Sequence, residues 1–138
     1  MKTSGNTFSR IAAALVGLAA GCSGDAFQPV EGAEPFVPPA AYDVLWTEVE
    51  DCSALTGTMS RVSWFLVPGT TTFDCEYGAC RGLWVAPHKI YLSDVAAHNF
   101  FRDNFFTVKH EILHDLVGEP GHPPVFEQCG LLRPGAPG

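Results

Sequence analysis

The chain has 138 residues, with 15 acidic and 8 basic side chains and a formal net charge of −7 at pH 7. Lys2 and Arg10 lie near the N-terminus, so the part after Cys22 keeps 6 basic residues against 15 acidic ones, a net charge of −9. Because this part contains no basic run, we expect it to bind neither nucleic acid nor anionic lipid headgroups through charge.

Residues 1–22 have the features of a secretory leader. Lys2 and Arg10 flank an uncharged apolar run over residues 11–20, too short to span a bilayer but typical of a signal peptide. The run ends in Leu18-Ala19-Ala20-Gly21-Cys22-Ser23, which resembles the lipobox of bacterial lipoproteins, although such boxes prefer leucine where Ala19 stands. The resemblance implies cleavage before Cys22 and lipidation of this cysteine. Ordinary signal cleavage and an uncleaved anchor are the alternatives.

These features predict a protein of the bacterial cell envelope that is attached to the membrane through the acyl chains of Cys22. It would lie on the outer membrane or on the outer face of the cytoplasmic membrane.

The remaining chain is predicted to form one small domain between two loose segments. Residues 23–41 are rich in Pro, Gly and Ala and are expected to form a semi-extended tether, and residues 130–138 a flexible tail. The domain itself, residues 42–129, is so small that cross-links or a metal ion would help to stabilise it. We expect an α+β fold, in which an N-terminal helix is followed by a short antiparallel or mixed sheet and then by a second long helix.

The first half of this domain is expected to contain a helix and two strands. The helix begins near Asp43, a plausible cap, and runs to about residue 55, with Gly57 after its end. Residues 61–67 and 70–74 are predicted to be strands on either side of a Pro-Gly turn.

The second half is expected to contain a hairpin and the second long helix. Residues 82–86 and 89–93 have the apolar pattern of paired strands. Asp94 opens a helical region, and Asp103 is expected to cap the following helix, which continues to about residue 117 and ends at Gly118.

Four cysteines remain besides Cys22, an even number that indicates two disulfides in an exported domain. Three pairings are possible, and the sequence does not choose among them. We favour a short Cys75–Cys80 loop, together with a Cys52–Cys129 bridge between the early part of the domain and its end. Ligation of zinc by these cysteines is the alternative, but the C-x-x-C pairs of structural zinc sites are missing.

The strongest chemical signal is His110-Glu111-Ile112-Leu113-His114 within the second long helix. A helix places residues four apart on one face, so His110 and His114 can offer ring nitrogens to one metal ion. Glu111 lies beside them, where it can accept a proton from water. Apolar residues surround most of this helix, which predicts that the two histidines line an interior cleft. The alternative is a pair of core histidines with hydrogen-bond partners.

Catalytic zinc normally has three protein ligands, so one more is needed. We predict His122, because the four residues before it must leave the helix and turn, and extended they reach at most about 13 Å. Four alternatives are Glu119, Glu127, His98 and His88. Asp115 projects away from the line of the two histidines, and we expect a supporting or exposed carboxylate there.

The H-E-x-x-H run followed by His122 resembles the active-site helix of zincin metallopeptidases, over about twenty residues. The resemblance implies a zinc-dependent peptidase, with His110 and His114 as zinc ligands and Glu111 as general base. The chain departs from metzincins, because Val117 and Pro120 stand at their glycine and third-histidine positions and no methionine follows Met59. It departs from gluzincins because too little chain follows Glu127 for a further ligand helix.

Peptide hydrolysis also needs a hydrogen-bond donor for the developing oxyanion. Five candidates are Tyr77, Tyr91, His88, His98 and Arg102. In zincins an edge strand binds extended peptide by strand addition, and residues 89–93 are our candidate for this role.

Two other classes of function stay open. One is a non-catalytic, zinc-stabilised envelope lipoprotein that acts as a binding module and has a closed four-ligand site. The other is a hydrolase similar to peptide deformylases, which use the same motif with a cysteine ligand. Cys80, near Glu76 and Gly78, would be that cysteine, but deformylation is cytoplasmic and an exported chain with oxidised cysteines argues against it.

Overall fold

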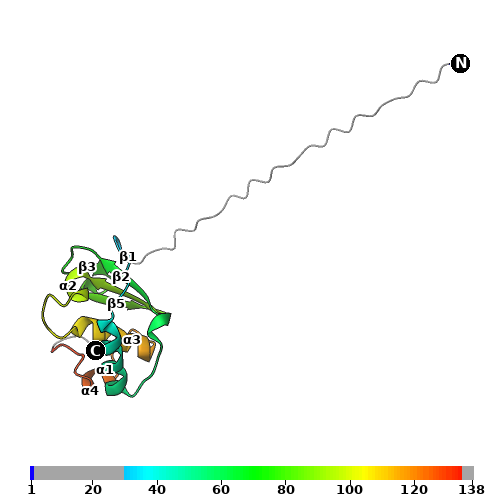
Figure 1. The fold of residues 1–138 in the computed structure, drawn as a ribbon. Coiled ribbons are helices and arrows are strands. Elements are labelled where there is room, and N and C mark those ends of the chain that lie inside the picture. Colours follow the sequence, from blue (N-terminus) through cyan, green and yellow to red (C-terminus); the bar gives the residue numbers. More distant parts are fainter. Residues whose placement is uncertain (2–29, 135–138) are drawn as a thin grey trace.

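The computed structural model describes residue 1 and residues 30–134, so the predicted leader and Cys22 lie outside the described residues. A four-stranded sheet forms one layer, and the longer helices lie together on one side of it (Figure 1). The predicted α+β class is therefore confirmed. Among the described residues, no helix combines the length and apolar character needed to cross a membrane.

The elements follow one another along the chain as β1 (Glu34–Pro35), α1 (Ala41–Ser53), a 3₁₀ turn (Met59–Arg61), β2 (Ser63–Val67), β3 (Phe73–Cys75), β4 (Gly78–Cys80), β5 (Gly82–Val85), β6 (Lys89–Ser93), α2 (Asp94–Ala97), α3 (Phe106–Val117) and α4 (Val125–Gln128).

The main sheet has the strand order β1-β2-β6-β5 and is mixed. β6 pairs with β2 in parallel and with β5 in an antiparallel hairpin, in which Trp84 lies opposite Ile90. The predicted hairpin is thus confirmed. Since β6 is paired on both sides, the prediction that residues 89–93 bind peptide as an edge strand is wrong. Among the described strands, the edge strand next to β6 is β5.

The two faces of the sheet are covered differently, because successive strand residues point to opposite sides. Ile90 and Leu92 belong to the apolar cluster that includes the helices. Tyr91, between them, belongs to a second cluster with Leu83 and Phe73. Phe73 comes from β3, so the second face is covered by the small β3–β4 ribbon.

That ribbon differs from the expected arrangement of residues 70–74. β3 does not return along β2 but pairs with β4, and the Cys75–Cys80 disulfide joins the two strands. Both edges of β2 are already occupied by β1 and β6, which leaves no position for β3 beside β2.

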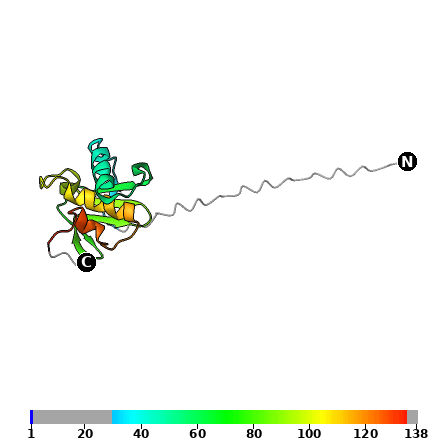
Figure 2. The same cartoon turned by 90° about the horizontal axis from the view of Figure 1, so that it is seen from below.

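The two long helices cross each other over one face of the sheet (Figure 2). Their buried residues recur at intervals of three and four, as expected for helices with one apolar face. In α3, Val108, Ile112 and Leu113 have no exposed surface. In α1, Leu45 and Val49 belong to the same cluster. This packing fixes α3, which carries the histidine motif.

The ends of α1 differ from the prediction. Its N-cap is Ala40, without a side-chain hydrogen bond, and Asp43 lies inside the first turn. The helix ends at Ser53, close to the predicted end near residue 55, and its C-cap is Ala54 in the left-handed conformation at φ 57° rather than Gly57.

The folded domain begins before residue 42. Val30 is only 1% exposed and packs in the cluster on the second face of the sheet. Glu34 and Pro35 form β1, which pairs with β2. The predicted tether over residues 23–41 is therefore wrong for this part of the chain, because β1 is paired in the sheet, Phe36 packs against the main apolar cluster and α1 begins at Ala41, although Val37 is exposed.

The end of the chain is also more ordered than predicted. Leu131 is buried, and the Arg133 guanidinium lies 3.0 Å from the carboxylate of Asp103. The predicted flexible tail over residues 130–138 is thus wrong for residues 130–134.

Both favoured disulfide pairings are present. Cys52–Cys129 joins residues 77 positions apart and links the last turn of α1 to the residue that follows α4. Cys75–Cys80 closes the small ribbon. With all four cysteines oxidised, none of them is free to act as a metal ligand, which also removes Cys80 as a candidate.

Candidate metal centre

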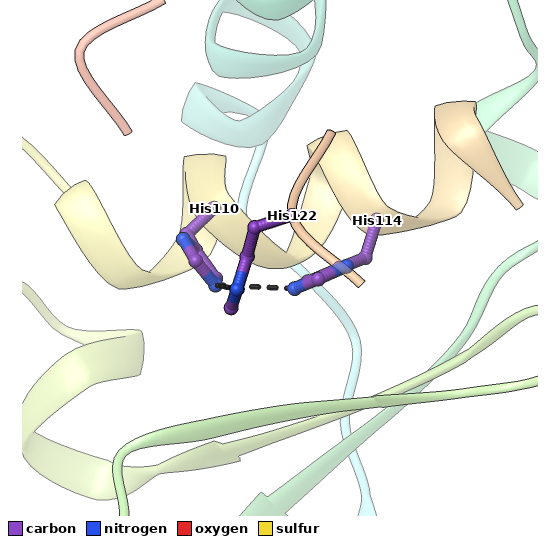
Figure 3. A group of neighbouring side chains, drawn as sticks. All are labelled: His110, His114 and His122. Atoms are coloured by element: carbon purple, nitrogen blue, oxygen red, sulfur yellow. Dashed lines mark hydrogen bonds between the residues drawn. The ribbon is translucent and has the colours of Figure 1, made fainter. Parts of the chain in front are cut away.

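Three histidine side chains converge beside α3. His110 and His114 leave the helix on the same side, and His122 reaches them from the following loop (Figure 3). The Nε2 atom of His110 lies 3.1 Å from that of His114 and 3.2 Å from that of His122. One ring nitrogen from each residue lies within 4.8 Å of the others, so this group could hold a metal ion.

The structure thus brings together the two motif histidines and the third residue predicted from the sequence. Within residues 30–134, the group that could hold a metal ion contains none of the four alternative ligands. His88 instead contacts Asp115, and His98 contacts Asp94.

The turn after α3 explains how His122 reaches the helix. Gly118 has a φ of 81°, a left-handed conformation that glycine adopts without steric cost, and its N–H donates to the carbonyl of His114 at 2.8 Å. The predicted end of the helix at Gly118 is confirmed. Because the chain reverses here, the segment that follows returns along the helix to the histidines.

The start of α3 is built differently from the prediction. Phe105, at φ 54°, is the N-cap, and the side chain of Asn99 accepts hydrogen bonds from the N–H groups of Asp103 and Phe105 at 3.2 and 3.0 Å. The prediction that Asp103 caps α3 is wrong, since its carboxylate contacts Arg133 instead.

Backbone carbonyls orient two of the histidine rings. The Nδ1 atom of His110 lies 2.6 Å from the carbonyl oxygen of Leu131, and that of His114 lies 2.9 Å from the carbonyl oxygen of Glu119. A carbonyl oxygen only accepts, so each Nδ1 carries the hydrogen, and each Nε2 of the neutral ring presents a lone pair. The two lone pairs face each other across 3.1 Å, an arrangement that a shared cation would stabilise.

Burial keeps these two rings neutral. Desolvation lowers the pKa of His110 to about 4, although the hydrogen bond to Leu131 acts in the opposite direction and the nearby charges of His122 and Arg133 lower it further. Desolvation likewise lowers the pKa of His114 to about 4. The neutral form is the one that ligates metal ions.

Two aromatic side chains hold the histidine rings in place. Phe126 has no exposed surface, and its ring centroid lies 5.1, 4.5 and 4.9 Å from those of His110, His114 and His122. Trp84, from β5, stacks on His114 with a centroid distance of 6.3 Å. Sequence reasoning missed both residues, since an apolar residue in a strand or short helix is already explained by the core.

Glu111 lies on α3 between the histidines and β5. Its side chain is buried, and desolvation raises its pKa to about 8, while a hydrogen bond with the backbone of Trp84 acts to lower it. A Cβ atom at Gly82 would lie 2.5 Å from Oε1 of Glu111 and 2.7 Å from Thr107. Only glycine therefore allows β5 to approach Glu111 this closely.

Asp115 is buried rather than exposed, with a relative exposure of 1%. Its carboxylate accepts hydrogen bonds from Arg61 at 2.9 and 3.1 Å and from the indole N–H of Trp84 at 3.1 Å, and it contacts Nδ1 of His88 at 2.9 Å. The expectation of an exposed carboxylate is wrong. A supporting role fits, because Asp115 fixes the Trp84 ring that stacks on His114.

Two clefts meet at this group of residues. One, of about 570 Å³, includes Arg81 and Arg133, and the other, of about 490 Å³, includes Tyr77 and Trp84. Residues common to both are Gly82, His110, Glu111 and His122. The histidines and Glu111 are therefore accessible from a hollow on the surface.

Of the five candidate oxyanion donors, only Tyr77 lines either cleft. Tyr91 is buried in the cluster on the other face of the sheet and stacks on Phe65. His88 and His98 lie against the carboxylates described above, and Arg102 is exposed away from both clefts.

Comparison with known proteins adds nothing to this geometry: no protein-family model, curated protein or solved structure matches the chain significantly.

Proposed function

We propose that the protein is a zinc-dependent metallopeptidase of the bacterial cell envelope, in which His110, His114 and His122 bind zinc and Glu111 is the general base. The observation that carries the proposal is the convergence of three Nε2 atoms on one point of a cleft that also contains Glu111.

The spacing of the nitrogens supports zinc. A tetrahedral zinc ion with bonds of about 2.0–2.1 Å would hold two ligand nitrogens roughly 3.3 Å apart. The separations of 3.1 and 3.2 Å to His110 are close to this value. Three protein ligands leave one position open for water or substrate, which is typical of catalytic rather than structural zinc.

Zinc bound at these histidines would act as a Lewis acid that lowers the pKa of water and polarises a substrate carbonyl. Glu111 then accepts the proton from that water and later donates it to the leaving amine. A cation on the histidines favours the carboxylate form of Glu111 despite its burial, so the residue can act as a base.

The peptide would lie along β5, because this strand is the free edge beside α3. Backbone groups of β5 can pair with an extended substrate across the histidines. Tyr77 lies at the turn of the β3–β4 ribbon and lines the same cleft as Trp84 and His114, so its hydroxyl is our candidate for the oxyanion donor.

The proposed cellular location is supported by the leader-like sequence of residues 1–22 and by the cysteines. Cleavage before Cys22 and its lipidation would anchor the protein in the envelope. The two disulfides agree with an exported, oxidising environment.

The test compares Glu111→Gln with Glu119→Gln, since Glu119 is exposed and outside the histidine group. Zinc content is measured on the purified full chain, and cleavage is measured on a mixed peptide library by mass spectrometry. We expect Glu111→Gln to retain zinc but lose cleavage by at least about a hundredfold, and Glu119→Gln to behave as wild type.

Retention of activity in Glu111→Gln would overturn the assignment of the base. Zinc binding by wild type without cleavage of any peptide would instead support the non-catalytic binding module.

A further inference from the structure

Two arginines lie at one end of the metal-binding cleft. Arg81 and Arg133 line the larger cleft together with His110, Glu111 and His122. Among residues 30–134, three of the six basic side chains lie within 4.0 Å of a carboxylate, namely Arg61, Lys109 and Arg133. Whether each of the two arginines in the cleft already has a carboxylate partner decides which of them could bind a ligand.

Arg133 is already paired. Its guanidinium lies 3.0 Å from Asp103 and 4.5 Å above the ring of Phe106. Arg81 is different: within residues 30–134, no carboxylate pairs with its guanidinium, which lies 4.0 Å above the ring of Phe101. Its N–H donors remain available to a ligand in the cleft.

The position of Arg81 is fixed by the backbone on both sides. Its carbonyl accepts the N–H of Ser93 at 2.8 Å, which extends the β5–β6 ladder by one residue. Cys80, before it, is held in a disulfide, and Gly82, after it, lies against Glu111. With the guanidinium also stacked on Phe101, little conformational freedom remains to be lost when a ligand binds.

The other cleft has no such cation. Its lining, as far as the structure describes the chain, contains Tyr77, Leu83 and Trp84 but neither lysine nor arginine. Among residues 30–134, the only carboxylate that lines either cleft is that of Glu111, which both share. A ligand that lies across the histidines therefore meets a positive charge on one side only.

We propose that Arg81 binds a carboxylate group of the substrate, so that the cleft selects peptides that carry a negative charge on the Arg81 side of the cleaved bond. The proposal rests on the peptidase function. The carboxylate can come from an acidic side chain or from the C-terminus of the peptide. A guanidinium binds either source through paired, charge-assisted hydrogen bonds.

The experiment uses two series of matched peptides and the zinc-loaded full chain. One series exchanges Glu for Gln at each position around the cleaved bond, and the other compares a free C-terminal carboxylate with an amide. Variants are Arg81→Gln, Arg81→Lys and the control Arg102→Gln, which removes the same charge from an exposed site outside both clefts. Thermal unfolding checks that each variant is folded.

We expect kcat/KM to favour the charged peptide by roughly ten- to a hundredfold in one series, which identifies the source of the carboxylate. Arg81→Gln should remove most of this preference, Arg81→Lys should retain part of it, and Arg102→Gln should retain all of it. Equal cleavage of charged and neutral peptides, or an unchanged preference in Arg81→Gln, would overturn the proposal while leaving the peptidase function in place.

If no peptide is cleaved, a binding experiment distinguishes the carboxylate site at Arg81 from the peptidase function. The same peptides are titrated into Glu111→Gln by calorimetry, with and without the Arg81→Gln change. Tighter binding of the charged peptide that depends on Arg81 would support the carboxylate site although the peptidase proposal had failed. Equal affinities would overturn the carboxylate site as well.

Discussion

His114 and Asp115 are neighbours on α3, yet their polar groups are satisfied in opposite ways. The Asp115 carboxylate is surrounded by donors from Arg61, Trp84 and His88, so its charge is balanced within the chain. The Nε2 atom of His114 faces another histidine acceptor at 3.1 Å. A buried polar group whose partners are all within the chain stabilises the fold, whereas acceptors that face one another form a suitable site for a cation.

The largest expected loss of stability is that caused by Asp115→Ala in the metal-free protein. The change removes the acceptor for Arg61 and leaves the indole N–H of Trp84 without its partner. We expect the free energy of unfolding to fall by about 3–5 kcal/mol, measured by urea denaturation. A loss below about 1 kcal/mol would mean that the Asp115 cluster is not a structural centre.

Zinc should stabilise the protein only through the histidine group. At a free zinc concentration about 100 times Kd, the free energy of unfolding of wild type should rise by about 2.7 kcal/mol. In His122→Ala the same concentration should give a clearly smaller increase, because one of the three ligands is lost. Equal stabilisation of the two proteins would show that His122 is not a ligand.

The pH dependence of the metal-free protein follows from the two lowered histidine pKa values and the raised pKa of Glu111. Between pH 6.5 and about 4 the unfolded chain binds more protons at His110 and His114 than the folded protein does, so their contribution to stability is lost as the pH falls. Between pH 4.5 and about 8 the folded protein retains a proton on Glu111 that the unfolded chain releases, so this contribution is lost as the pH rises.

The two effects together predict maximal stability near pH 6.5 for the metal-free protein. Between this pH and about 8, Glu111 alone should lower the free energy of unfolding by about 1.4 kcal/mol per pH unit. Denaturation of wild type and Glu111→Gln at several pH values tests this. A decline of the same steepness in both proteins would contradict the raised pKa of Glu111.

The smallest effect is expected at a surface ion pair. Lys109, one residue before His110, lies 3.5 Å from Glu48, whose side chain is 48% exposed. Glu48→Gln should change the free energy of unfolding by less than about 0.5 kcal/mol, because exposed pairs are screened by water. This variant is the matched carboxylate control for Asp115→Ala, and a loss as large as that of Asp115→Ala would remove the distinction between them.

Regular residue spacing and the short segment after α3 made much of the histidine group predictable from the sequence. The four-residue spacing of His110 and His114 in a helix predicted that they share a face, and the short chain between them and His122 predicted that it returns to them. The even number of cysteines predicted two bridges, and the favoured pairing is the one present.

The support around the ligands was not predictable, because it consists of long-range contacts without a sequence signature. The acceptor for His110 is the backbone carbonyl of Leu131, a group that every residue carries. Phe126 and Gly82 are common residue types whose roles depend on what lies opposite them in space. Residues 30–41 were misjudged for a similar reason, since an average composition does not identify a single buried residue such as Val30.

The left-handed turn at Gly118 lets one short stretch of chain, from His110 to His122, bring together all three proposed ligands. A protein designer could therefore copy the ligands into another helix by transplanting that stretch alone. The transplant would lack the Trp84 and Phe126 rings and the carbonyl of Leu131, all of which come from outside it. In such a graft the histidine rings would be loosely oriented toward the ion. The three histidines can therefore be transferred to another helix, but the exact orientation of their rings depends on the rest of this fold.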